Sequence, residues 1–171
     1  MSAPEVQTLY EVCARTWPAA SQAQVGSWTI RDGAGGGQRV SAATCDGPVQ
    51  DIAAAEAAMG ALGQVPLFMI RSGEADLDGA LEARGYAIKD PVNVYACPVS
   101  HLTDRPIPKV TAFTIWEPLH IMRDIWHSGG IGAERIAVME RCTAPKTGLL
   151  GRLNDHPAGA GYCAIHDGIA K

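Results

Sequence analysis

The sequence predicts a mixed α/β fold in two half-domain-like units, on the basis of three observations. Segments with helical spacing of apolar residues are interleaved with segments in which apolar and polar residues alternate, as in half-buried strands. Apolar residues make up 47% of the chain and charged residues 19%, which is typical of a folded globular protein. A polar stretch with two prolines, residues 99–109, is expected to link the two units.

The composition argues against several classes of function. A net charge of −4 and the lack of any basic run speak against nucleic acid as a partner. No apolar run is long enough to cross a bilayer, and the first residues lack the layout of a signal peptide. The five cysteines are widely spaced without a C-x-x-C pair, which favours reduced thiols in a cytoplasmic protein over a disulfide or a nucleophilic cysteine.

In the first unit, helices are predicted from apolar spacing and from their end signals. An opening helix ends before Pro18, a second spans 51–62 with Asp51 as its N-cap residue, and a short third ends before Gly85. Strands are predicted at 25–32, 38–45 and 66–70, and one or two strands at 86–98, where Pro91 favours an edge position for the first part.

The second unit begins with a strand at 109–116, which is followed by two helices at 117–127 and 131–142. A hairpin of 147–153 and 159–167 comes next, and Asp167-Gly168 is a strong two-residue turn into a further strand. Only three residues follow this turn, so we expect the fold to continue past Lys171. An unpaired edge on strand 160–166 would favour a homodimer or another pairing partner.

The glycine-rich segment 31–40, "RDGAGGGQRV", raises the possibility of a phosphate-binding loop. Such a loop needs glycines at a strand-to-helix turn, where backbone N–H groups face the anion. The residues after these glycines alternate as in a strand, so a flexible hairpin loop is predicted instead.

The helix predicted at 117–127 has an apolar face and an opposite polar face. His120, Asp124 and His127 stand at i, i+4 and i+7 on the polar face and could hold a divalent metal, with His156 or His166 completing the shell. A solvated helix face explains the same pattern more simply, so no metal is expected.

Four residues of the second unit are candidates for substrate binding: Arg135, Trp116, Trp126 and His120. Arg135 falls in the middle of an apolar arc of helix 131–142. A charge there needs a structural ion pair, for instance with Asp124, a stem that snorkels to solvent, or an anionic group of a ligand. The two tryptophans flank the preceding helix and belong either to the core or to a substrate-lining wall.

Two stretches resemble the GNAT superfamily of N-acyltransferases. Residues 66–98 follow the order of the closing half of that fold: a strand, a helix ending in a glycine–aromatic pair, and two strands. "LEARGY" (81–86) stands where the family typically has Leu-Tyr-x-x-x-Gly-Phe. From Lys109 onward the order is that of the opening half: a strand, two helices lining the acceptor side, and a hairpin. The resemblance implies a mixed central sheet flanked by helices, with a degenerate lobe at 1–100 and the front part of an acetyltransferase domain at 106–171.

The same resemblance implies transfer of an acetyl group from acetyl-coenzyme A to an amine of a small molecule or protein. Leu81 stands where the family often has a tyrosine as general acid. The family's Gln/Arg-x-x-Gly-x-Gly/Ala loop for the pyrophosphate does not occur in these residues, so no cofactor-binding or catalytic residue is assigned. Residues 1–171 alone are therefore expected to be inactive. The alternative is a catalytically inactive GNAT-like module that binds a ligand or another subunit.

Overall fold

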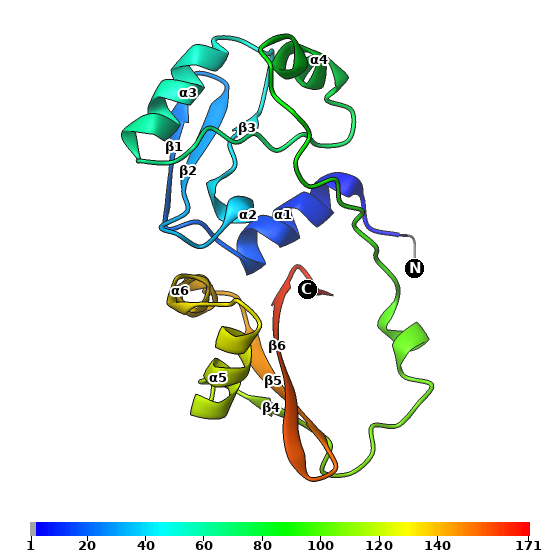
Figure 1. The fold of residues 1–171 in the computed structure, drawn as a ribbon. Coiled ribbons are helices and arrows are strands. Elements are labelled where there is room, and N and C mark those ends of the chain that lie inside the picture. Colours follow the sequence, from blue (N-terminus) through cyan, green and yellow to red (C-terminus); the bar gives the residue numbers. More distant parts are fainter. Residues whose placement is uncertain (1–2) are drawn as a thin grey trace. The chain divides into compact units, whose positions relative to one another are not determined.

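The structure, a computed structural model, describes residues 3–171 and divides into two compact units (Figure 1). The central unit is Ala19–Tyr95, and the terminal unit combines the chain up to Pro18 with Ala96–Lys171. The described residues form a mixed α+β structure with two antiparallel sheets and six α-helices, which confirms the predicted mixed class. The opening helix belongs to the terminal unit and not to the first lobe predicted at 1–100.

The sheet of the central unit has the antiparallel order β1-β2-β3, formed by Ser21–Val25, Trp28–Asp32 and Thr44–Cys45. The predicted pairing of β2 with the segment before Cys45 is correct, because Trp28 pairs with Cys45. The predicted strand 38–45 is wrong in its first half, where Gln38–Ser41 forms a one-turn helix, α2. Local bonds explain this turn, since the Ser41 hydroxyl donates to the carbonyl of Gly37 (3.1 Å).

Two helices of the central unit, α3 (Ile52–Ala61) and α4 (Ala75–Ala83), match their predicted positions. The Asp51 side chain accepts from the Ala54 N–H (3.0 Å), which confirms the predicted N-cap. The strand predicted at 66–70 is reduced to a single parallel bridge between Phe68 and Ala43. No strand forms at 86–98. After Tyr86, successive side chains of this segment are all exposed, so neither face of residues 87–98 packs against a core.

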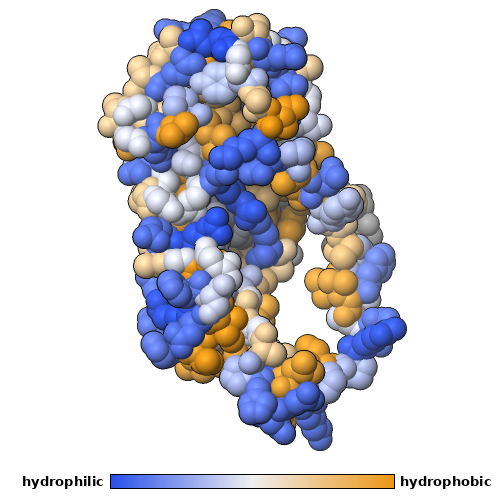
Figure 2. Space-filling model, in the orientation of Figure 1, coloured by the Kyte–Doolittle hydropathy of each residue, from blue (hydrophilic) through white to orange (hydrophobic). Residues whose placement is uncertain are grey.

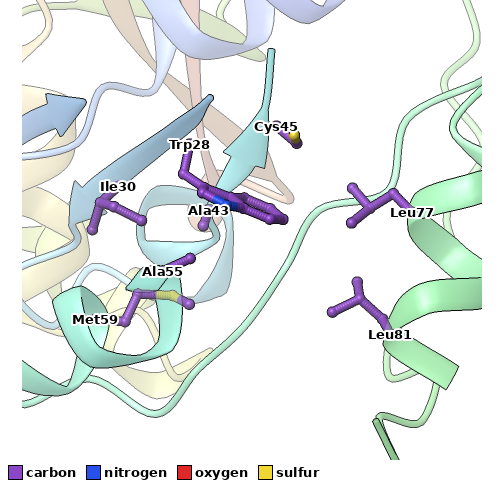
Figure 3. Close-up of a cluster of buried hydrophobic side chains, with 8 residues drawn as sticks. All are labelled: Trp28, Ile30, Ala43, Cys45, Ala55, Met59, Leu77 and Leu81. Atoms are coloured by element: carbon purple, nitrogen blue, oxygen red, sulfur yellow. The ribbon is translucent and has the colours of Figure 1, made fainter. Parts of the chain in front are cut away.

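The core of the central unit gathers eight buried side chains around Trp28 (Figure 3): Trp28, Ile30, Ala43, Cys45, Ala55, Met59, Leu77 and Leu81. An edge-to-face chain of rings extends this core from Trp28 through Phe68 to Tyr86, with centroids 5.3 Å and 5.2 Å apart. Gly85 has a φ of 88° at the end of α4, a conformation that favours glycine and turns Tyr86 back onto the core. Gly85-Tyr86, the end of the "LEARGY" stretch, therefore has a structural role.

The sheet of the terminal unit has the antiparallel order β4-β5-β6-β7. Its strands are Ala112–Ile115, Lys146–Leu153, His156–His166 and Ile169–Ala170. The predicted Asp167-Gly168 turn is confirmed: both residues have positive φ, and His166 pairs with Ile169 across it.

Three helices pack with this sheet: α1 (Val6–Thr16), α5 (His120–Ser128) and α6 (Ala133–Arg141). The helices α5 and α6 lie between β4 and β5 in the chain, as predicted. The buried cluster consists of Met122, Trp126, Ile136, Met139 and Leu150. Tyr162 on β6 connects the sheet to the end of α1. Its ring lies edge to face against Trp17, and its hydroxyl donates to the Thr16 carbonyl (3.4 Å). Burial, with a smaller effect of the Cys142 thiol, raises the pKa of Tyr162.

Residues 87–111 run as an extended connection with one short 3-10 turn, Val99–Leu102. Apolar side chains lie exposed along it, and Figure 2 shows orange atoms on this part of the chain. None of the helices in residues 3–171 combines the length and apolar character needed to cross a bilayer.

Candidate functional site

Arg135, the first predicted substrate-binding residue, is exposed, which contradicts the buried ion pair that was one of its predicted alternatives. The buried residues of this helix are Ile136, Val138 and Met139. Arg135 lies in the first turn, and side chains on a helix lean toward its N-terminus. The exposed side chain therefore lies near the start of the helix, where a helical-wheel projection does not distinguish core from solvent.

The two predicted tryptophans have different environments. Trp126 belongs to the core, with 3% of its surface exposed and its Nε1 donating to the Ala160 carbonyl (3.2 Å). Trp116 is half-buried, with its ring 6.0 Å from that of Tyr162 and the Lys146 ammonium 4.6 Å from its centre. That ammonium also donates to three carbonyls at the end of α6, so it serves as a helix cap.

His120 stands on the outer surface of α5, and its side chain is 90% exposed. It lies 3.6 Å from a carboxylate oxygen of Asp124, one turn along the helix. Within residues 3–171, no group of three His, Cys, Asp or Glu side chains is arranged to hold a metal ion. His166 is instead 3.9 Å from Glu11 on α1. The binding roles of His120, Arg135 and the tryptophans stay predictions.

A shallow groove of about 370 Å³ lies on the surface between α5 and α6. Its lining combines charged and aliphatic side chains around a glycine, namely Arg123, Asp124, His127, Ile131, Gly132, Ala133, Ile136 and Glu140. Across the groove, Arg123 Nη2 donates to Glu140 Oε1 (3.0 Å), which ties the two helices together. The sequence had placed Asp124 and His127 on a polar face but did not place Glu140 of α6 beside them. The one available signal for this neighbourhood was the pair of opposite charges on consecutive helices, Arg123 on α5 and Glu140 on α6.

The groove lining combines an imidazole, carboxylates and a guanidinium with apolar side chains. Histidine is the side chain best suited to proton transfer at neutral pH, and the groove contains His127. The aliphatic side chains of Ile131 and Ile136 supply an apolar wall for a carbon chain.

The glycine-rich loop 33–37 is engaged in structural bonds. The Gly33 N–H donates to Gln64 Oε1 (2.8 Å), and the Ala34 N–H donates to Asp32 Oδ1 (2.8 Å). The sequence predicted that no helix follows this loop, which is wrong because α2 follows directly. With only four residues, α2 presents too weak a dipole to hold an anion.

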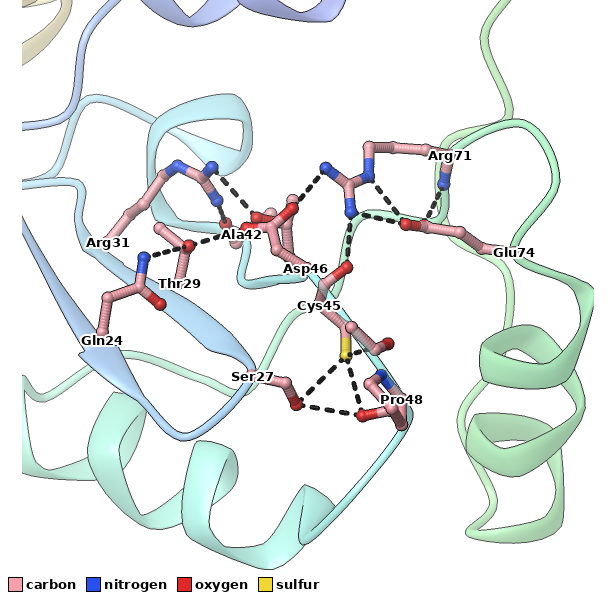
Figure 4. Close-up of polar contacts among 12 residues, drawn as sticks. Gln24, Ser27, Thr29, Arg31, Ala42, Cys45, Asp46, Pro48, Arg71 and Glu74 are labelled. Atoms are coloured by element: carbon pink, nitrogen blue, oxygen red, sulfur yellow. Dashed lines mark hydrogen bonds and ion pairs between the residues drawn. The ribbon is translucent and has the colours of Figure 1, made fainter. Parts of the chain in front are cut away.

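The loop after β3 is held by a polar network that joins it to the start of α4 (Figure 4). Arg71 donates to Asp46 Oδ1 (2.8 Å) and to Glu74 Oε1 (2.7 Å), and Arg31 donates to the Ala42 carbonyl (2.8 Å). Burial alone would raise the pKa of Asp46, but hydrogen bonds from Arg71 and Thr29 outweigh it and lower that pKa. Every charged group of this network has a protein partner, so its role is to fix the loop.

No protein-family model matches this chain, and neither a curated protein nor a solved structure matches it significantly.

Replacing Arg135 with methionine is expected to leave the free energy of unfolding within about 0.5 kcal/mol of the wild type. The side chain is exposed, and such surface changes have small effects. Urea denaturation followed by circular dichroism measures this. A loss of 3–5 kcal/mol, the cost of breaking a buried ion pair, would mean that Arg135 has a structural partner after all.

Proposed function

We propose that this protein is a GNAT-type N-acetyltransferase and that its terminal unit supplies the acceptor side. The observation that carries the proposal is the order of elements in that unit. A strand is followed by two helices and then by antiparallel strands, in the sheet order β4-β5-β6-β7. This order resembles the opening half of the GNAT fold, in which the two helices line the acceptor, and here they border the groove.

The proposed reaction forms a carbon–nitrogen bond between the acceptor amine and the acetyl carbon. The carbon–sulfur bond of acetyl-coenzyme A breaks, the amine nitrogen loses a proton, and the coenzyme leaves as a thiol. His127 is the groove residue suited to take the proton from the amine.

The central unit does not fit the pyrophosphate of acetyl-coenzyme A. A phosphate would need the free N–H groups at the start of α3. The Asp51 carboxylate accepts from the Ala54 N–H there and would repel an anion. This supports the description of the central unit as degenerate. It also favours the alternative function, a GNAT-like module that binds a ligand without acetyl transfer.

Enzyme and module are separated by assaying the product of the full open reading frame for amine-dependent release of coenzyme A thiol. The proposal expects thiol release in step with N-acetylated amine, detected by mass spectrometry. Ligand binding without thiol release across a panel of amines would overturn it in favour of the module. Residues 1–171 alone are expected to give no turnover and to bind acetyl-coenzyme A no more tightly than about 1 mM by calorimetry.

A further inference from the structure

The sheet of the terminal unit carries its helices on one face, which we call the inner face. Gly148 on β5 faces α5, because a Cβ at this position would lie 2.6 Å from Met122 Cε. Leu150, two residues further along the strand, belongs to the buried cluster with α5 and α6. Tyr162, the partner of Gly148 on β6, holds the end of α1. Figure 1 shows α5 and α6 together on one side of the β5–β6 hairpin.

The opposite, outer face of this sheet is uncharged. It is formed by Thr114 on β4 and by alternate residues of 147–151 on β5 and 159–165 on β6. None of these residues is an acid or a base, and Leu149 and Ile165 are 40% and 45% exposed. An antiparallel sheet that faces water usually carries polar side chains on that side. The lack of charge therefore marks the outer face as a contact surface.

A projecting side chain and a bare stretch of backbone lie next to each other on the outer face. The side chain is that of Leu149, which lies over Gly161, where a Cβ would be 3.6 Å from Leu149 Cδ1. The bare stretch is the pair formed by Gly151 and Gly159, and a Cβ on Gly159 would meet no atom within 4 Å. Gly151 follows Leu149 by two residues, so the two features are about 7 Å apart along the strand.

We propose that the outer face binds the outer face of a second copy of this chain and forms a two-fold symmetric homodimer. A two-fold axis that runs between the two sheets and crosses the strands midway between Leu149 and Gly151 brings the leucine of each copy onto the bare backbone of the other. Such an interface is self-complementary, because the same two features meet twice. The second copy also brings no charge to the contact, so none has to leave water.

The size of the outer face makes this homodimer a weak one. Strand β5 has 8 residues, or about 27 Å, and four paired strands span about 19 Å, so each copy contributes about 500 Å². A total of about 1,000 Å² lies at the low end of specific interfaces and is typical of transient complexes. The homodimer is therefore expected to dissociate on dilution, and it does not depend on the proposed acetyltransferase function.

Sedimentation velocity between about 10 μM and about 1 mM tests the homodimer, and the wild type is expected to pass from monomer to dimer over this range. Leu149→Lys is expected to raise the dissociation constant about tenfold or more, because dimerisation would bury its ammonium against the partner's backbone. Gly159→Val is expected to act in the same direction by filling the bare stretch that receives the leucine. Ile121→Lys, a similar change at a 38% exposed position on α5, is the matched control and is expected to leave the dissociation constant unchanged.

A mixture of isotope-labelled and unlabelled chains identifies the contact directly. Isotope-filtered NOE spectra are expected to connect the Leu149 methyl groups of one copy with the Gly159 Hα protons of the other. A monomer over the whole concentration range would overturn the homodimer. If Leu149→Lys then lowered the melting temperature of this monomer more than Ile121→Lys, another segment of the same chain would be the one that covers the face. A dimer that Leu149→Lys and Ile121→Lys weaken equally would also overturn the inference, because its contact would lie elsewhere.

Discussion

Replacing Trp126 with alanine is expected to destabilise the terminal unit by about 3–5 kcal/mol, the range measured for large-to-small changes at buried aromatic positions. The indole is 3% exposed and belongs to the cluster between α5, α6 and the sheet. Its removal leaves a cavity and also leaves the Ala160 carbonyl without its donor, the Trp126 Nε1. Urea denaturation followed by far-ultraviolet circular dichroism reports the change.

The controls for this prediction separate packing from substrate binding. Trp126→Phe retains most of the apolar volume and is expected to cost less than half as much as the alanine variant. His120→Ala, on the exposed side of the same helix, is expected to change the free energy of unfolding by no more than about 0.5 kcal/mol. A stable Trp126→Ala protein with weakened ligand binding would instead return Trp126 to a substrate-lining role.

Gly148→Ala, which adds a single methyl group, is expected to destabilise the terminal unit by about 3 kcal/mol, at the upper end of the range for overpacked cores. A Cβ at this position on β5 would lie 2.6 Å from Met122 Cε and 2.8 Å from the Ile115 carbonyl oxygen. The methionine end can move, but the carbonyl belongs to the neighbouring strand and cannot. Strand β4 would have to separate from β5 where Ile115 pairs with Gly148.

Gly159→Ala is the matched control, because Gly159 lies in the same sheet and a Cβ there meets no atom within 4 Å. Its free energy of unfolding is expected to stay equal to or above that of the wild type, since alanine restricts the unfolded chain. Equal destabilisation by the two variants in thermal melts would show that glycine itself, and not the close approach at Gly148, matters in this sheet.

The elements that could be predicted correctly carry their signals locally. The helix α3 has Asp51 at its start and Gly63 after its end, and these residues act through the backbone within one turn. Asp167-Gly168 fixes a hairpin because its two positive φ values match the twist of the strands.

The predictions that failed depended on partners elsewhere in the chain. Residues 86–98 have the strand-like composition, but a strand requires a neighbour with free backbone groups, and the structure provides none for them. In the segment 66–70, only Phe68 forms a bridge, to Ala43, so no full strand develops there. At Arg135, the wheel placed the residue on an apolar face, but the helix buries Ile136, Val138 and Met139 and leaves Arg135 exposed.

The sequence by itself determined the mixed class, most helices, and the order of elements on which the GNAT resemblance rests. It also determined the ends of α3 at Asp51 and Gly63 and the Asp167-Gly168 turn. The tertiary structure decided which helix belongs to which unit: α1 packs with β6 through Trp17 and Tyr162, 145 positions apart in the chain. It also decided that Trp126 is core and that Asp124 and Glu140 share a groove. The physical reason is that periodicity records the face of one element, whereas burial and charge at a site depend on which elements meet there.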